Sequence, residues 1–240
     1  MRSLLPSLSF QLFNLPTFPP FNLEPMKIIC KTTLLSVPAP TFRGTEIGIV
    51  TTSDSPTFGI FLAFLADGHE SGTLDWGDGK VTVITPDVTR FTHTYETPGA
   101  YTVRISDDIG KLEISCHLAN EFFRIYAPLI QSVEVVSNNV ILWNAFVRGA
   151  SALTSVNLAY CATAALPNRA FLRCTALERI ELPNIETVDA VMSDAAKPFT
   201  DCAALREIVF SAAHRESIMA SEGWLADPTL GAPNAQIVFR

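Results

Sequence analysis

The chain has 240 residues, of which 48% are hydrophobic and 17% charged, and its net charge is −7. This composition argues against global disorder, and the length has room for two modest domains. No basic patch alternates with aromatic residues, so we expect no nucleic-acid partner. The longest apolar run, Ile60 to Ala66, is far shorter than the ~20 residues of a membrane helix, so we expect no membrane span.

Residues 1–45 are rich in phenylalanine, leucine and proline, and the prolines break any helix. Arg2 and the leucines after it have the character of an export signal, but Pro6 interrupts the apolar run and no cleavage site follows. Met26 offers a second start of translation. We expect a disordered leader, or one included through a mispredicted start. An export signal and a structured arm are the alternatives.

From Glu46 to Cys116, short alternating runs are separated by turn residues, which is the pattern of an antiparallel β-sandwich. Asp75 to Gly79 is expected to form a tight hairpin, because Asp-Gly supplies the positive φ angles of such turns. Thr97 to Gly99 predicts a second turn. The predicted strands cover residues 47–51, 58–64, 80–84, 90–95, 100–105 and 111–117.

Two halves of one motif occur in this segment: Trp-Gly-Asp-Gly, then His-x-Tyr-x-x-Pro-Gly-x-Tyr-x-Val. Together they resemble the PKD (polycystic-kidney-disease) domain. The residues that carry the match are Trp76, Gly77, Asp78, Gly79, His93, Tyr95, Pro98, Gly99, Tyr101 and Val103. The resemblance implies an immunoglobulin-like module, found mostly outside cells as a spacer or adhesion unit, with no catalysis of its own.

Beyond His117 the chain repeats itself. Leu153, Leu177 and Leu205 occupy equivalent places 24 and 28 residues apart, and a degenerate copy lies at Ile130 to Val135. This spacing is close to that of leucine-rich repeats, in which each unit buries its apolar side only against a neighbour. The expected inward residues are Val133, Val135, Val156, Leu158, Ile180, Leu182, Ile208 and Phe210.

The sequence of these repeats resembles the BspA-like leucine-rich repeats of bacterial surface proteins. Cys174 and Cys202 match the cysteine of that family, whereas the first copy has Gly149-Ala150 there and one extra residue. We expect the two cysteines to be small buried thiols, with a disulfide as the alternative. The segment from Ser217 to Arg240, with a final strand at 236–239, is expected to cap the stack.

The outward face of the stacked strands is the predicted binding surface, because the core does not constrain its residues. The candidate binding residues are Glu134, Asn157, Arg179, Glu181 and Glu207, with Ser132, Ser155 and Val209 between them. The alternative is a surface that only solvates the sheet, with Arg179 and Glu207 as an exposed cross-strand pair.

Metal and catalytic sites are not predicted. Acidic residues in two loops would suit a calcium ion: Asp67, Glu70, Asp75, Asp78, Asp107 and Asp108. Their spacing does not match a calcium-binding loop, and hydrogen bonds to the turn backbone explain them without an ion. His93 with Asp78 lacks any nucleophile motif, so catalysis is not expected.

The sequence therefore predicts a mainly β protein with short helices, in three parts: a leader (1–45), an immunoglobulin-like antiparallel β-sandwich (46–116) and a short leucine-rich-repeat solenoid with its cap (117–240). By resemblance, we expect a non-enzymatic recognition or adhesion protein at a cell surface or secreted, without cofactors, whose ligand is a protein or a glycan. An accessory module of a secreted hydrolase and a structural spacer are the alternatives.

Overall fold

The computed structural model describes residues 44–64, 72–85, 88–106, 112–115, 125–137, 140–142, 144–190 and 197–240. Contacts group the chain from Ala39 to Arg240 into one compact unit, and only this unit is described below. The predicted leader lies outside the described residues, apart from Gly44 and Thr45, which begin the first strand.

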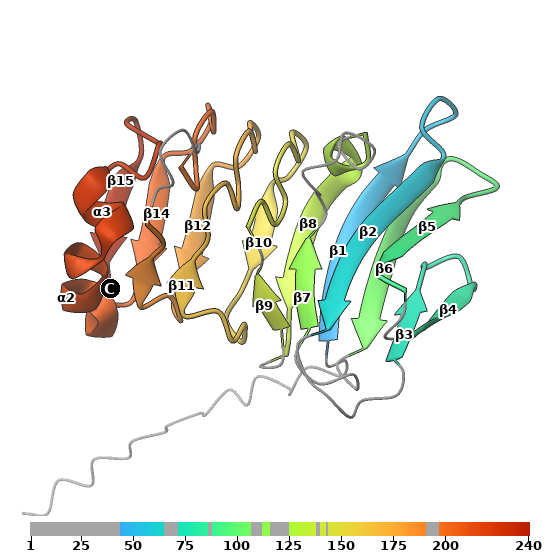
Figure 1. The fold of residues 1–240 in the computed structure, drawn as a ribbon. Helices are drawn as coiled ribbons and strands as arrows, with labels where there is room; N and C mark the ends of the chain where they lie inside the picture. The colour runs from blue at the N-terminus through green and yellow to red at the C-terminus, as the bar shows by residue number, and fades with distance from the viewer. Residues whose placement is uncertain are drawn as a thin grey trace, which may run out of the picture. The chain divides into compact units, whose positions relative to one another are not determined.

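The largest sheet has six strands and joins segments from both predicted halves (Figure 1). All neighbouring strands in it are antiparallel except β8 and β10, which are parallel. In spatial order the strands are β10 (Ser155–Asn157), β8 (Ile130–Val135), β1 (Gly44–Thr51), β6 (Gly99–Ser106), β3 (Gly72–Asp75) and β4 (Val81–Ile84).

A second sheet of four strands also joins the two halves, because β7 pairs in parallel with β9. Its spatial order is β5 (Arg90–Thr94), β2 (Thr57–Phe64), β7 (Leu112–Ser115) and β9 (Val140–Leu142). Of the seven strands in the described parts of residues 44–115, six lie where alternation predicted a strand, and β3 was expected only as one arm of the hairpin.

The rest of the chain forms parallel pairs. The three-stranded sheet contains β12 (Arg179–Leu182), β14 (Glu207–Phe210) and β15 (Gln236–Phe239), and a two-stranded sheet contains β11 (Ala165–Leu166) and β13 (Thr187–Val188). The described helices are η1 (Ala127–Leu129), η2 (Ala212–His214), α2 (Arg215–Ala220) and α3 (Glu222–Ala226). The prediction of a mainly β chain with short helices is confirmed.

One hydrophobic core extends through this unit, from Ile47 to Ala232. Leu153, Leu177 and Leu205 are all fully buried in it, as their spacing predicted. Phenylalanine rings from successive copies also pack together: Phe146 meets Phe171 edge-to-face with ring centroids 6.2 Å apart, and Phe171 stacks on Phe199 at 5.4 Å. The predicted boundary after Cys116 stays a prediction, but this core includes residues from both sides of it.

The strand faces follow the predicted alternation with one correction. Seven of the eight expected inward residues are buried, and Val156 is partly buried against the same core. Val209, expected on the solvent face, is only 7% exposed. It lies on the middle strand of its sheet, where Glu181 and Val238 flank it in register.

The turns before the strands repeat as well. Gly149, Arg173, Asp201 and Gly231 occupy equivalent places and all have positive φ, between 61° and 85°. Backbone hydrogen bonds link successive turns: Gly149 N–H donates to Leu172 O at 2.7 Å, and Arg173 N–H to Thr200 O at 2.9 Å.

Cys174 and Cys202 are buried thiols, which confirms the prediction. Each Sγ donates to a carbonyl of the preceding copy: Cys174 to Val147 O at 3.4 Å, and Cys202 to Phe171 O at 3.0 Å. These weak hydrogen bonds repeat from copy to copy and run in the opposite direction to the backbone hydrogen bonds, which are donated by the earlier copy to the next one.

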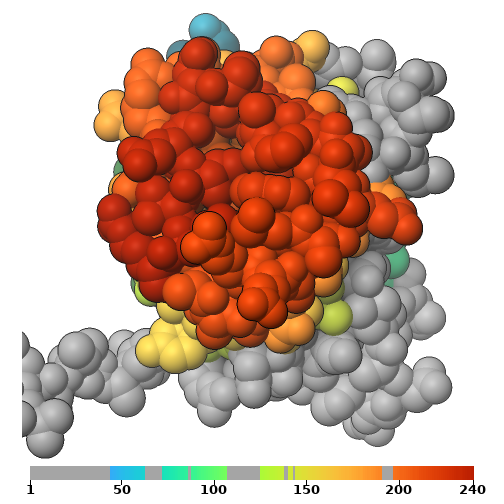
Figure 2. Space-filling view, turned by 90° about the vertical axis from the view of Figure 1, so that its left-hand side faces the viewer, coloured from blue at the N-terminus to red at the C-terminus, as the bar shows by residue number. Residues whose placement is uncertain are grey.

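The C-terminal segment ends in the predicted strand, β15, which pairs in parallel with β14. Trp224 of α3 packs on Phe239 with ring centroids 5.9 Å apart. Figure 2 shows this end of the unit, where the residues of the C-terminal part form the visible surface. In the described part of the chain, no helix has the length and apolar character needed to cross a membrane.

Candidate functional site

The hairpin between β3 and β4 is built as the sequence predicts. Gly77 and Gly79 have φ angles of 84° and 87°. Asp75 Oδ1 accepts from Gly77 N–H at 2.8 Å, and Asp78 Oδ1 accepts from Lys80 N–H at 3.1 Å. Both aspartates therefore use carboxylate oxygens to hold the turn backbone, and this role explains them without a bound ion.

The aromatic residues of the motif pack behind this hairpin. Trp76 is 2% exposed and its Nε1–H donates to Thr82 Oγ1 at 2.9 Å. Tyr95 O–H donates to Trp76 O at 2.9 Å, and its ring stacks on Tyr101 with centroids 4.0 Å apart. Pro98 precedes β6, and Gly99 N–H donates to Thr51 Oγ1 at 3.2 Å. Burial raises the pKa of Tyr95, so this hydroxyl stays protonated and acts as a hydrogen-bond donor.

His93 and Asp78 meet in the same cluster. His93 Nε2 lies 2.8 Å from Asp78 Oδ2, and the imidazole stacks on Trp76 with centroids 5.1 Å apart. Burial by itself raises the pKa of Asp78, but hydrogen bonds from His93 and from the Lys80 backbone hold it below its usual value. These contacts fix the hairpin against the sheet.

Four of the acidic residues considered for a calcium site lie outside the described residues: Asp67, Glu70, Asp107 and Asp108. Within the described ranges, no group of three or more His, Cys, Asp or Glu side chains is arranged to hold a metal ion. Asp75 and Asp78 bind their own turn instead.

The predicted binding residues lie on the outward side of the strands in two groups. Glu134 and Asn157 are register partners on β8 and β10, and Asn157 Nδ2 donates to Glu134 Oε1 at 3.0 Å. The register continues this row across β1, β6 and β3. The complete row is Asn157, Glu134, Glu46, Arg104 and Asp75.

Arg179, Glu181 and Glu207 form the second group, on β12 and β14. Arg179 Nε donates to Glu207 Oε2 at 2.5 Å, and its terminal nitrogen donates to Glu181. Arg240 donates to the other Glu207 oxygen at 2.8 Å. The hydrogen bond from Arg179, together with the charge of Arg240, holds the pKa of Glu207 below its usual value. The expected pair is therefore part of a four-residue ionic network.

Sequence reasoning missed several members of this surface. Glu46 and Arg104 belong to the row because β1 pairs with β8, a contact between segments distant in sequence. Arg240 joins through the parallel pairing of β15.

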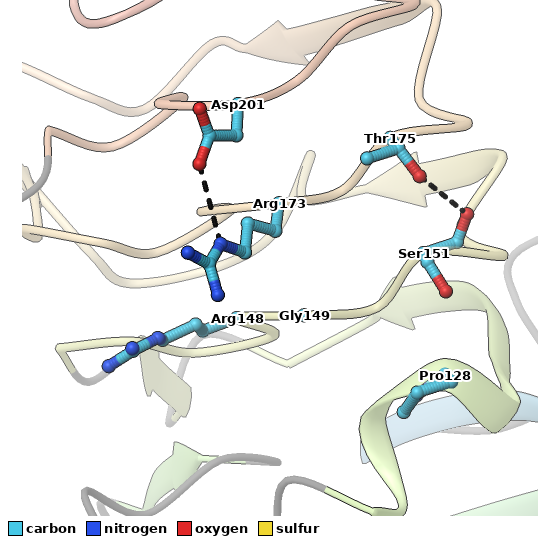
Figure 3. A pocket seen from close by; sticks show the side chains of 7 residues that line it. All are labelled: Pro128, Arg148, Gly149, Ser151, Arg173, Thr175 and Asp201. Carbon is cyan, nitrogen blue, oxygen red and sulfur yellow. Dashed lines mark hydrogen bonds and ion pairs between the residues drawn. The ribbon is translucent and has the colours of Figure 1, made fainter.

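A groove of about 450 Å³ lies at a different place, where the chain turns into the parallel strands (Figure 3). Its lining comes from η1 and from the three turns that precede β10, β12 and β14. The lining residues are Pro128, Arg148, Gly149, Ser151, Arg173, Thr175 and Asp201. None of them was predicted as a site residue, although the departure of Gly149 from the repeat pattern marks the position where the groove opens.

Comparisons with protein-family models, with curated proteins and with solved structures each found no match. The PKD-like and BspA-like assignments therefore depend on the residues themselves.

Proposed function

We propose that this chain is a non-enzymatic recognition protein, secreted or at a cell surface, in which a PKD-like immunoglobulin sandwich is joined to a short BspA-like leucine-rich-repeat stack. Its ligand would be a protein or a glycan, bound on the outward face that carries Glu134, Asn157, Arg179, Glu181 and Glu207. The PKD-like motif and the equivalent leucines and cysteines support the assignment to these two kinds of module.

The observation that carries the proposal is the row of register partners from Asn157 to Asp75. It extends the candidate surface beyond one module, so a ligand could contact five neighbouring strands at once. Extended sheet surfaces of this kind are what repeat proteins use for binding.

The affinity is expected to be modest. The face is mixed polar and its charged residues already have partners, so a ligand must compete with existing ion pairs. We expect binding at roughly micromolar affinity or weaker, which corresponds to about 8 kcal/mol or less.

A structural spacer is the second candidate function. The same ion pairs favour it, because exposed pairs and polar rims need no ligand to explain them. A spacer would show no specific ligand in a screen, whereas a recognition protein would.

The test is a screen of the purified chain against arrays of glycans and extracellular proteins, followed by binding measurements on variants. Arg179→Ala with Glu181→Ala removes charges from the face and should weaken binding of any specific hit. The matched control is Lys80→Ala with Glu96→Ala, which removes another exposed ion pair, from the hairpin region. Undiminished affinity of the first double variant, if it stays folded, would remove this face from consideration.

A further inference from the structure

The groove beside η1 lies at a position where one side chain is missing. Gly149, Arg173 and Asp201 hold equivalent, positive-φ places in successive turns, but only the glycine has no side chain to fill the space beside Arg173. A Cβ at position 149 would meet only the Ala127 Cβ, at 3.8 Å. The volume of the groove, about 450 Å³, is within the ~300–1,000 Å³ range of small-molecule pockets.

Two guanidinium groups line this space. Arg148 and Arg173 come from successive turns, and Figure 3 shows both side chains extending toward the left of the view. A guanidinium has five N–H donors in a fork that matches planar oxyanions. Arginine is therefore the side chain most suited to binding carboxylate, sulfate or phosphate at such a place.

The ion pair between Arg173 and Asp201 is weak, so a ligand can take the place of Asp201. Arg173 Nε lies 3.3 Å from Asp201 Oδ2, and the two side chains are 56% and 60% exposed. Ion pairs with this exposure contribute little to stability, since water screens them and two long side chains lose freedom. Within the described ranges, the hydrogen bond to Asp201 uses only Nε and leaves the terminal nitrogens of Arg173 for another acceptor.

The remaining lining suits a ligand with hydroxyl groups. Ser151 and Thr175 occupy equivalent places in neighbouring copies, and Thr175 Oγ1 donates to Ser151 O at 3.3 Å. Both hydroxyl oxygens can accept hydrogen bonds from a ligand. Pro128 supplies an apolar wall on the η1 side.

From these observations we propose that the groove is a binding site for a small ligand that presents an oxyanion to Arg173 and Arg148, with Ser151 and Thr175 contacting its hydroxyl groups. Acidic sugars and phosphate or sulfate groups share this chemistry. The site goes beyond the recognition function proposed above, because none of its residues lies on the outward strand face.

The first measurement is a titration of the intact chain with D-glucuronate, D-glucose, sulfate and inorganic phosphate, followed by NMR. We expect glucuronate or an inorganic oxyanion to bind in the millimolar range and neutral glucose to bind at least about tenfold more weakly, since a charge-assisted hydrogen bond is lost. A preference for glucuronate identifies an acidic sugar as the source of the oxyanion, and a preference for phosphate or sulfate identifies an ester or free ion.

Two variants separate binding from folding, because both break the same ion pair. Arg173→Gln removes the donor and should weaken oxyanion binding about tenfold. Asp201→Asn removes the competing carboxylate and should strengthen binding about two- to fivefold. If the ion pair mattered only for structure, the two variants would change binding in the same direction.

Arg169→Gln is the matched control. Arg169 also has a positive φ, 59°, and belongs to the same copy, but it does not line the groove. Gly149→Asn is a blocking variant, because asparagine tolerates positive φ and its side chain occupies the hollow. We expect the control to bind like the wild type and the blocking variant to bind weakly.

The proposal is overturned if no oxyanion probe binds in the millimolar range. It is equally overturned if Arg169→Gln weakens binding as much as Arg173→Gln, or if Asp201→Asn weakens it. These results leave the outward-face function intact, because that function is tested by the Arg179 and Glu181 double variant.

Discussion

Glu134 of β8 lies directly opposite Glu46 of β1 in the antiparallel register that joins the two predicted modules. Like charges in this position are unfavourable. Each carboxylate has its own donor on the far side: Arg104 Nε at 2.7 Å from Glu46, and Asn157 Nδ2 at 3.0 Å from Glu134. Donors on the neighbouring strands therefore offset the repulsion between Glu46 and Glu134.

Arg104→Ala should destabilise the protein by about 0.5–1 kcal/mol, because it leaves Glu46 facing Glu134 without its counter-charge. Adding Glu46→Gln should recover most of that loss by removing the repulsion. Urea unfolding of the two variants at low and high salt measures both effects. A double variant that is less stable than Arg104→Ala alone would contradict this account of the junction.

Leu177→Ala should lower the free energy of unfolding by about 2–5 kcal/mol, the usual cost of truncating a fully buried leucine. Leu225, which is 68% exposed, provides the control, and Leu225→Ala should change stability by less than about 0.5 kcal/mol. Thermal unfolding compares the two. Equal melting temperatures would show that Leu177 is not in a packed core.

The hairpin glycines separate backbone strain from steric conflict. At Gly79 a Cβ would meet nothing within 4 Å, so Gly79→Ala should cost only the ~1–2 kcal/mol of a positive φ, and Gly79→Val more. At Gly77 the Cβ would lie 2.6 Å from Thr102 O, so Gly77→Ala should be clearly worse. Chemical denaturation of the matched alanine variants checks the order. Equal costs would argue against the close approach of β6 to Gly77.

Asp227 should make the C-terminal segment sensitive to acid. Burial alone raises its pKa, but hydrogen bonds from Lys197 and Thr229 lower it to about 2, against an ordinary value of 3.8. A carboxyl whose pKa is depressed by folding stabilises the protein above its unfolded pKa. That contribution, about 2 kcal/mol, is lost as the pH falls from about 4 to about 2.

Unfolding of Asp227→Asn as a function of pH measures this contribution. The variant should be less stable than the wild type at pH 7, and the difference should shrink as the pH falls below about 4. A difference that stays constant between pH 7 and pH 2 would show that the carboxylate charge has no role there.

Local patterns in the sequence predicted the local structure well. Alternation located β1, β2 and β6, the Asp-Gly turn predicted the positive φ of Gly79, and the leucine spacing predicted the buried positions. These features depend on neighbours in the chain, which the sequence displays directly.

Pairings between the two predicted modules were not predicted, although the cross-strand neighbours Arg179 and Glu207 within the repeats were. Alternation says which face of β8 is apolar but not that its edge pairs with β1, so Glu46 and Arg104 were missed as members of the outward row. The groove beside η1 was also missed. Gly149 indicates the groove only when the equivalent turns are compared in the structure, where Arg173 of the next turn has a side chain and Gly149 has none.

Mapping a bound ligand by NMR tests the proposed recognition surface most directly. The strongest hit of the glycan and protein screen would be titrated into ¹⁵N-labelled chain, and amide shifts followed residue by residue. We predict one contiguous set of shifts on β1, β8, β10, β12 and β14, including Glu46, Glu134 and Arg179. Shifts confined to the hairpin at Trp76, or the absence of any specific hit, would contradict a binding role for this face.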